Sequence, residues 1–189
     1  MYVVMIGRPG SGKGTQAKRL AVHLDAQHLA TGDLLRDAGQ EDSPRGRQIA
    51  ELQARGDFVP DETVWQLLQE RLRSTSGNVI FDGFPRHLAQ AKLLDGLLAE
   101  SGDRVDPAIN LEVSGEECTR RLLGRAALEG RADDTPETIG HRMEVYAELT
   151  EPLVEYYRQQ GVLRTLDGSG EEDVVFERIK QSIDAARAP

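Results

Sequence analysis

The sequence predicts an α/β fold with helices on both faces of a mostly parallel sheet. Short apolar segments rich in β-branched residues alternate along the chain with segments that carry apolar residues at helical spacing. Such alternation is typical of a parallel sheet in which a covering helix follows each strand. The 189 residues suffice for one compact core, so we expect a single domain over residues 1–189.

Five segments have the composition of strands, the second more weakly than the others. They are Tyr2–Ile6, Gln27–Ala30, Asn78–Phe81, Ala108–Val113 and Val162–Leu166. Helical patterns cover Gly14–Leu24, Asp61–Arg73, His87–Glu100, Gly115–Leu123, Thr135–Gln159 and Glu171–Ala186. Ligands of open parallel sheets bind beyond the carboxyl ends of the strands, so we expect functional residues directly after the strands.

Two stretches interrupt this alternation. Thr31–Val59 has helical pieces but little strand character, and Gly124–Asp134 is short and charged, without an apolar period. Each is a candidate for a mobile flap. The sequence has neither an internal repeat nor a flexible linker that would separate independent domains.

Composition narrows the possible partners and the compartment. With 23 Lys and Arg against 32 Asp and Glu, the chain has a formal charge of −9, which argues against binding to nucleic acid or to anionic membranes. Cys118 is the only cysteine, which excludes an intramolecular disulfide and a cysteine-rich zinc site, and we expect a buried thiol. The sequence shows no leader, membrane segment or spare apolar stripe, so we expect a cytoplasmic monomer.

A glycine-rich loop follows the first predicted strand. The stretch Gly7–Thr15 fits the pattern G-x-x-x-x-G-K and leads into a predicted helix. Its glycines let main-chain N–H groups converge on a polyphosphate beside the positive end of the helix, and Lys13 adds a full charge. A tight turn with an incidental lysine is the alternative, but the flanking strand and helix favour nucleotide binding. In the general motif a hydroxyl residue follows the lysine directly, whereas here Gly14 precedes Thr15.

This form of the loop, from Gly7 to Gln16, resembles that of the adenylate kinase family, in which glycine follows the lysine. Other segments are similar to motifs of the same family: Thr31-Gly32-Asp33-Leu34-Leu35-Arg36, Asp82-Gly83-Phe84-Pro85-Arg86, Gly124-Arg125, Arg131-x-Asp133-Asp134 and Arg142. The resemblance spans nearly the whole chain. It implies a fold like that of P-loop nucleoside-triphosphate hydrolases, with a core (residues 1–29, 60–124 and 131–189), a helical monophosphate-binding flap (residues 30–59) and a lid (residues 125–130).

The lid expected from this resemblance is short. Longer bacterial members of the family carry a lid insertion that often binds zinc, whereas only Ala126–Gly130 separates Arg125 from Arg131 here. The chain therefore resembles the short form of the family. We expect a loop without structural zinc that closes over the site to exclude water.

The resemblance also implies which residues contact the two nucleotides. Those expected to contact ATP are Gly10, Ser11, Gly12, Lys13, Gly14, Thr15, Arg125 and Gly170. Those expected to contact AMP are Thr31, Arg36, Asp57, Phe58, Val59, Gly83, Phe84, Pro85, Arg86, Gln90, Arg131 and Arg142. Phe58 stands where leucine is more usual in the family.

Elementary chemistry supports several of these roles. Asp82 ends an apolar predicted strand beside the phosphate loop, where Mg²⁺ needs an outer-shell partner, and Arg86 offers a planar cationic fork to an acceptor phosphate. Taken alone, Asp82 is typical of a turn residue, and Arg36 is typical of a solvated surface residue. It is the match to the family motifs that favours a functional role for both. The histidines show no metal-binding or catalytic spacing, and we expect structural or surface roles for His23, His28, His87 and His141.

The reaction implied by the resemblance is reversible transfer of the terminal phosphoryl group from Mg²⁺-bound ATP to AMP, giving two ADP. Positioning and charge stabilisation, without a covalent intermediate, would come from Lys13, Asp82, Arg86, Arg125, Arg131 and Arg142. Two alternatives stay open. One is a kinase that uses another nucleotide, such as UMP or CMP as acceptor or GTP as donor, although Thr31 and Gln90 favour AMP. The other is a non-catalytic nucleotide-dependent switch, which the retained charged positions disfavour.

Overall fold

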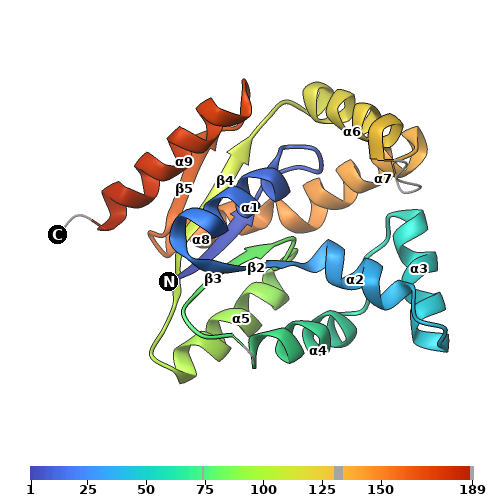
Figure 1. Cartoon of the computed structure of the whole chain (residues 1–189), viewed down its shortest axis with the longest axis horizontal. Coiled ribbons are helices and arrows are strands. Elements are labelled where there is room, and N and C mark those ends of the chain that lie inside the picture. The colour runs from blue at the N-terminus through green and yellow to red at the C-terminus, as the bar shows by residue number, and fades with distance from the viewer. Residues whose placement is uncertain (74, 130–133, 188–189) are drawn as a thin grey trace.

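The computed structural model describes residues 1–73, 75–129 and 134–187 (Figure 1). Parallel strands form one sheet in the order β2-β3-β1-β4-β5, with Val4 of β1 paired to Phe81 of β3 and Ala108 of β4. The strands are β1 (Tyr2–Ile6), β2 (Ala26–Ala30), β3 (Asn78–Asp82), β4 (Val105–Glu112) and β5 (Leu163–Asp167). The predicted α/β class is confirmed, and the weak strand signal belongs to edge strand β2.

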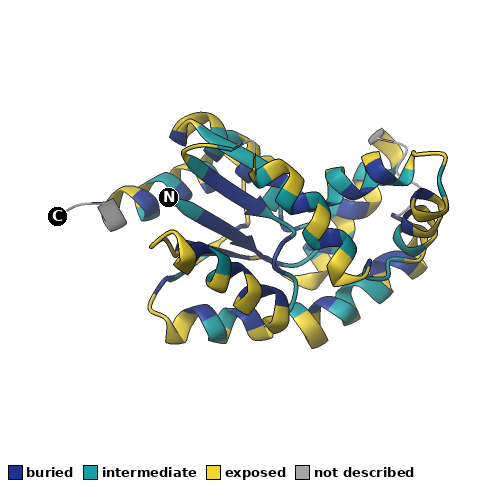
Figure 2. Ribbon diagram, turned by 90° about the horizontal axis from the view of Figure 1, so that it is seen from below, coloured by how far each residue is buried: buried dark blue, intermediate teal, exposed yellow. Residues whose placement is uncertain are grey.

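Helices pack on both faces of this sheet. They are α1 (Lys13–Leu24), α2 (Thr31–Gly39), α3 (Pro44–Arg55), α4 (Asp61–Leu72), α5 (Leu88–Glu100), α6 (Gly115–Glu129), α7 (Pro136–Val145), α8 (Pro152–Gln159) and α9 (Glu172–Arg187), with a π-helical turn, η1 (Tyr146–Thr150), between α7 and α8. Figure 2 shows the buried strands lying between helices whose outer surfaces are exposed. In the described part of the chain, no helix has the length and apolar character needed to cross a bilayer.

The first strand shows why the sheet lies in the middle of the molecule. Val3 and Met5 pack in an apolar cluster with residues of α1 and α9, whereas Val4 and Ile6 pack in a second cluster with residues of α5 and α8. Successive strand side chains point to opposite faces, so a strand buried on both faces is apolar throughout. All four side chains are at most 2% exposed. This burial fixes the position from which the phosphate loop starts.

One predicted helix is broken in the structure. The pattern over Thr135–Gln159 predicts a continuous helix, but the chain forms α7, the π-helical turn η1 and α8. Pro152 has no N–H group and cannot make the regular bond to the carbonyl four residues before it. The N–H of Glu151 binds the carbonyl of Tyr146 instead (2.9 Å), which is the wider bond of a π turn.

The expected lid is helical where it is described, so the prediction of a loop is wrong there. Helix α6 does not end near Leu123 but continues to Glu129. Its last turn contains Ala126 and Leu128, which favour helix intrinsically, and Leu128 is 89% exposed. Apolar periodicity misses such a turn because no apolar face packs against the core. Residue 130, the last of the expected lid, lies outside the described residues.

The flap touches the helix that follows the lid. In Figure 1, α2 and α3 lie at the lower right of the molecule, and α6 and α7 lie above them at the upper right. The hydroxyl of Thr138 on α7 donates to the carbonyl of Ala54 at the end of α3 (3.5 Å), and Nε2 of His141 lies 2.9 Å from Oδ1 of Asp57. Between these parts and the strand ends lies a cleft of about 1010 Å³.

Candidate active site

The phosphate loop joins β1 to α1 and lines the cleft. Gly10 and Gly12 have positive φ angles of +84° and +91°, and Gly12 caps α1. An ideal Cβ on Gly10 would lie 2.5 Å from the carbonyl oxygen of Cys118, so only glycine fits this approach to α6. Cys118 is fully buried, as predicted. The loop therefore presents the N–H groups of the first turn of α1, which have no partner within a regular helix, to the cleft.

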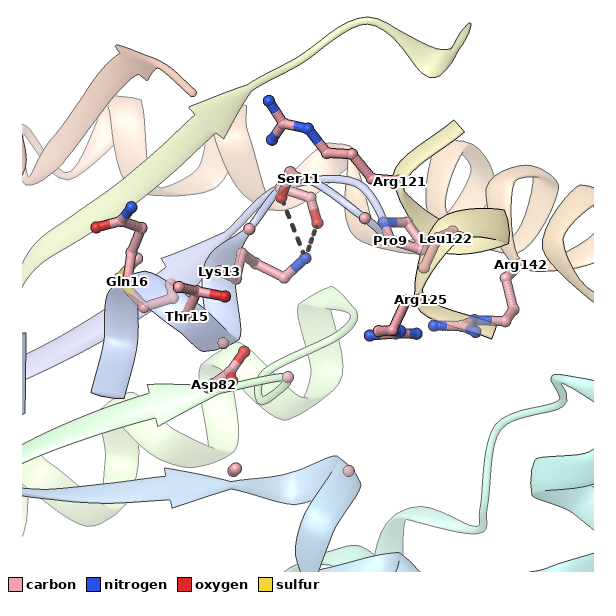
Figure 3. Close-up of a pocket in the computed structure, with 18 of the residues that line it drawn as sticks. Pro9, Ser11, Lys13, Thr15, Gln16, Asp82, Arg121, Leu122, Arg125 and Arg142 are labelled. Carbon is pink, nitrogen blue, oxygen red and sulfur yellow. Dashed lines mark hydrogen bonds between the residues drawn. The ribbon is translucent and has the colours of Figure 1, made fainter. Parts of the chain in front are cut away.

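The side chain of Lys13 folds back over this loop (Figure 3). Its Nζ atom donates hydrogen bonds to the carbonyls of Gly7 (2.5 Å) and Arg8 (2.9 Å). Burial lowers the pKa of Lys13 to about 8, although the negative charge of Asp82 opposes this shift. The ammonium group is thus a cation in a poorly hydrated site, where its attraction for a phosphate is stronger than in water.

The position of Asp82 explains why glycine follows the lysine in this loop. Asp82 ends β3, and an ideal Cβ on Gly14 would lie 3.3 Å from its Oδ2 atom. A side chain at position 14 would therefore crowd the carboxylate. Burial raises the pKa of Asp82, but the hydrogen bond with His28 (Nε2 to Oδ2, 3.3 Å) and the charge of Lys13 outweigh it, and the pKa lies below its usual range. An ionised carboxylate thus stands beside the phosphate loop.

This carboxylate fits a hard divalent cation that arrives with a polyphosphate. Mg²⁺ prefers oxygen ligands and usually keeps several of its waters. Asp82 and the hydroxyl residue Thr15 both line the cleft near Lys13 (Figure 3). Over the described ranges, no group of three or more His, Cys, Asp or Glu side chains is placed to hold a metal ion. Asp82 is suited to contact a cation through one of its waters.

A half-buried arginine, Arg86, follows Asp82 in the turn after β3. The Nε atom of Arg86 donates to the carbonyl of Gly83 (2.9 Å), its main-chain N–H donates to Oε1 of Gln90 (2.8 Å), and its carbonyl accepts from Oγ1 of Thr150 (2.7 Å). Burial and then the charge of Arg142 lower the pKa of Arg86 to about 10, so Arg86 stays protonated at neutral pH. Its planar, fixed cation suits a phosphate.

Arg125 of α6 and Arg142 of α7 approach each other in the cleft (Figure 3). Asp134 binds both: Arg125 donates through Nε (2.7 Å) and Nη2 (2.8 Å), and Arg142 donates through Nη1 (2.8 Å). Burial raises the pKa of Asp134, but the hydrogen bonds and charges of the two arginines outweigh it and hold the pKa below its usual range. One fully buried carboxylate side chain therefore directs two guanidinium groups.

The flap (residues 30–59) forms another wall of the cleft. Arg36 pairs with Asp33 within α2. The ring centroid of Phe58 lies 5.3 Å from Cζ of Arg86, a cation–π distance, and 6.4 Å from the ring of His87. Phe58 thus lies beside the turn of Arg86, in the stretch that joins α3 to α4.

A cavity of about 10 Å³ adjoins the cleft behind this wall, with Thr31 and Gln90 in its lining. Both are buried, so Gln90 is not an exposed helix residue. The hydroxyl of Thr31 has no hydrogen-bond partner among the described residues, whereas Nε2 of Gln90 donates to Asp61 (2.8 Å). A cavity of this size holds at most a water molecule.

Arg121 is a cleft residue that the sequence analysis missed. Its Nη1 atom donates to the carbonyl of Gly168, in the loop after β5, at 3.3 Å, and its Nε atom donates to Glu117 (2.7 Å). The available signal was its spacing, one helical turn before Arg125 on α6. Figure 3 shows the two side chains pointing to different parts of the cleft. Arg121 and Arg125 of α6 therefore place positive charge in two different parts of the cleft.

Most residues singled out from the sequence do line the cleft. They are Gly10, Ser11, Gly12, Lys13, Gly14, Thr15, Arg36, Asp57, Phe58, Val59, Asp82, Gly83, Pro85, Arg86, Arg125, Arg142 and Gly170. Thr31 and Gln90 line the small cavity instead. Phe84 lies in the core, with its ring centroid 6.3 Å from that of Phe81 and 6.1 Å from that of Trp65, and Arg131 lies outside the described residues.

Three of the histidines bind carboxylates from distant segments, which the sequence analysis also missed. The pairs are His28 with Asp82, His87 with Asp61, and His141 with Asp57. Partners in these pairs are 26 to 84 residues apart in the chain. No local pattern in a single sequence reports such a pairing.

The phosphate loop after the first strand of a parallel sheet, with further arginines facing it across one cleft, defines the class of P-loop phosphotransferases. The family model of adenylate kinase matches residues 5–162. An adenylate kinase of Thermus thermophilus is 50% identical over 181 residues, which cover 96% of each chain. An adenylate kinase of Xanthomonas campestris is 44% identical over 185 residues, which cover 97% of this chain and 99% of the relative. The chain belongs to the adenylate kinase family.

Proposed function

We propose that this chain catalyses the reversible transfer of the terminal phosphoryl group of Mg²⁺-bound ATP to AMP, giving two ADP. The observation that carries the proposal is that Lys13 of the phosphate loop shares one cleft with Arg86, Arg125 and Arg142. Two phosphate-bearing substrates bring together negative charges, which need cations on both sides during transfer. Membership of the adenylate kinase family supports ATP and AMP as the two substrates.

We assign the donor to the side of the phosphate loop. The N–H groups of residues 10–15 and the ammonium group of Lys13 bind the phosphates of ATP, and Arg125 contacts the same nucleotide from α6. The loop that contains Gly168 and Gly170 backs the base. The hydrogen bond from Arg121 to Gly168 supports this assignment, because it ties that loop to α6.

The acceptor lies between the flap and the turn after β3. Arg36 and Arg86 bind the phosphate of AMP, and Arg142 contacts both this phosphate and the transferring group, as does Arg131. The base enters beside Thr31 and Gln90. Further contacts come from Asp57, Phe58, Val59, Gly83 and Pro85, whereas the buried ring of Phe84 anchors the turn.

The chemistry is positioning and charge stabilisation. An oxygen of the AMP phosphate attacks the γ-phosphorus in line, and the bond to the β-phosphate oxygen breaks, so no protein atom is phosphorylated. Asp82 would hold the Mg²⁺ that arrives with ATP through one of its waters, and the ion would offset charge on the phosphates. Lys13, Arg86, Arg125, Arg131 and Arg142 offset the charge of the three equatorial oxygens.

Two moving parts follow from this assignment. The flap (residues 30–59) opens to admit the base, since the cavity at Thr31 and Gln90 is only about 10 Å³. The lid (residues 125–130) then closes over ATP and keeps water from attacking the γ-phosphate. The core consists of residues 1–29, 60–124 and 131–189.

We further propose that the protein works as a monomer in the cytoplasm. Among the described residues, the phosphate loop and the arginines assigned to both phosphates line one cleft within a single chain, which supports a site that is complete without a second copy. The lone, buried Cys118 suits a reducing environment such as the cytoplasm.

An acceptor panel tests this function. The purified protein is incubated with Mg²⁺ and ATP or GTP, and with AMP, UMP, CMP or GMP, and all nucleotides are quantified. We expect the ATP and AMP pair to give two ADP for each AMP consumed and the others to react far more slowly. Preference for another monophosphate would reassign the acceptor, and ATP binding without any transfer would indicate a switch.

A further inference from the structure

The main chain of Arg86 is held from two directions. Its N–H donates to Gln90, four residues further along the same segment, and its carbonyl accepts from Oγ1 of Thr150, which lies 64 residues away in the sequence. Thr150 also lines the cleft. It therefore ties Arg86 to a separate part of the fold.

The π-helical turn η1 accounts for the placement of Thr150. Thr150 is the last residue of η1, next to the wide bond from the N–H of Glu151 to the carbonyl of Tyr146. Pro152 follows and begins α8. Widened turns of this kind change the direction of the next side chains relative to a regular helix and are frequent at functional sites. Here the turn ends with a hydroxyl group against the carbonyl of Arg86.

The same turn also contacts the phosphate loop. The guanidinium carbon of Arg8 lies 6.0 Å from the ring centroid of Tyr146, and Nη2 of Arg8 lies 3.6 Å from Oε1 of Glu151. Nη1 of Arg8 donates to the carbonyl of Val113, directly after β4 (3.4 Å). One turn of helix therefore touches the loop assigned to the donor and the arginine assigned to the acceptor.

We propose that Thr150 is a positioning residue, through which η1 holds Arg86 at a fixed distance from the phosphate loop. This inference rests on the proposed function, because it concerns the distance between the two bound phosphates. In-line transfer depends steeply on that distance, and a displacement of about 1 Å costs on the order of 100-fold in rate. The hydroxyl acts on Arg86 and needs no contact with either nucleotide.

The test compares Thr150→Val, which keeps the shape and removes the hydroxyl, with Thr150→Ser, which keeps the hydroxyl. Thr119→Val is the matched control, because the partner of the Thr119 hydroxyl among the described residues is the carbonyl of Gly115 in the same helix, α6 (2.9 Å). We expect Thr150→Val to lower kcat by about 10- to 100-fold and to raise the KM for AMP, with the KM for ATP unchanged. Thr150→Ser and Thr119→Val should stay within about threefold of the parent protein in kcat.

A double-mutant cycle separates positioning from a general loss of structure. If Thr150 acts through Arg86, the Thr150→Val change should have little further effect on kcat in an Arg86→Met background. The inference is overturned if Thr150→Val keeps the parent kcat or if Thr150→Ser has as low a kcat as Thr150→Val. It is also overturned if the effects of Thr150→Val and Arg86→Met on kcat multiply in the double mutant. The parent protein is assayed alongside: absence of ADP formation there would contradict the proposed function itself, a result distinct from any of these.

Discussion

Arg125 and Asp134 form a two-bond ion pair, with Nε of Arg125 2.7 Å from Oδ2 and Nη2 2.8 Å from Oδ1 of Asp134. Asp134 also accepts from Arg142, and its side chain is fully buried. Planar pairs of this kind fix the direction of the guanidinium group as well as its charge. Asp134 thus orients two of the cations that we assign to phosphoryl transfer.

Replacing Asp134 with asparagine should therefore reduce both activity and stability. The buried charge and at least one of its bonds to arginine are lost, so we expect kcat to fall by about 10- to 100-fold and the free energy of unfolding by about 3 kcal/mol. Turnover and denaturant unfolding measure the two effects. Asp42→Asn is the control, since the Asp42 side chain is fully exposed and pairs only with Arg47 among the described residues. Parent-like values for Asp134→Asn would contradict the role of this pair.

The pH dependence of kcat/KM for ATP should report the protonation state of Lys13. Burial lowers its pKa to about 8, so the free protein loses this positive charge as the pH rises through that value. We expect kcat/KM for ATP, which reflects the free protein, to fall above about pH 8. The phosphates of bound ATP favour the charged ammonium, so kcat should fall only at higher pH. A kcat/KM for ATP that stays constant to pH 9.5 or so would contradict this assignment.

The pair of His141 and Asp57 predicts a modest effect on acceptor binding. It joins α7 to the flap at 2.9 Å, and both side chains are partly exposed. Exposed pairs contribute up to about 1 kcal/mol, so His141→Leu should raise the KM for AMP by at most about fivefold and leave the KM for ATP unchanged. High salt should reduce the difference. Asp42→Asn again serves as the control, because it breaks a pair within the flap, and an unchanged KM for AMP in His141→Leu would exclude the contact as a support of flap closure.

Local features of the site could be predicted from the sequence. The loop before Lys13 needs glycines with positive φ, and Asp82 follows an apolar strand, so both are visible in short patterns. The reason for Gly14 was not visible, because the carboxylate that limits the space there belongs to a strand 68 residues further along. The same holds for Thr150 and Arg86, whose contact depends on how η1 packs against the turn after β3.

Errors in the helix predictions have a similar origin. Periodicity over Thr135–Gln159 identified the apolar face but not the π turn before Pro152, where one missing N–H changes the hydrogen bonding of the preceding turn. Around Leu128, periodicity missed residues that are helical, because intrinsic propensity extends α6 where no apolar face marks the helix. Periodicity therefore identified the apolar faces of these helices but not the points at which a helix is interrupted or ends.

The most direct measurement of the central claim is the turnover of Lys13→Met with ATP and AMP. Lys92→Met makes the same change on an exposed position of α5 and serves as the control. If the cleft transfers a phosphoryl group from a nucleotide on the phosphate loop, Lys13→Met should lose at least about 100-fold in kcat while unfolding like the parent protein. A folded Lys13→Met protein that forms ADP at a near-normal rate would contradict the account.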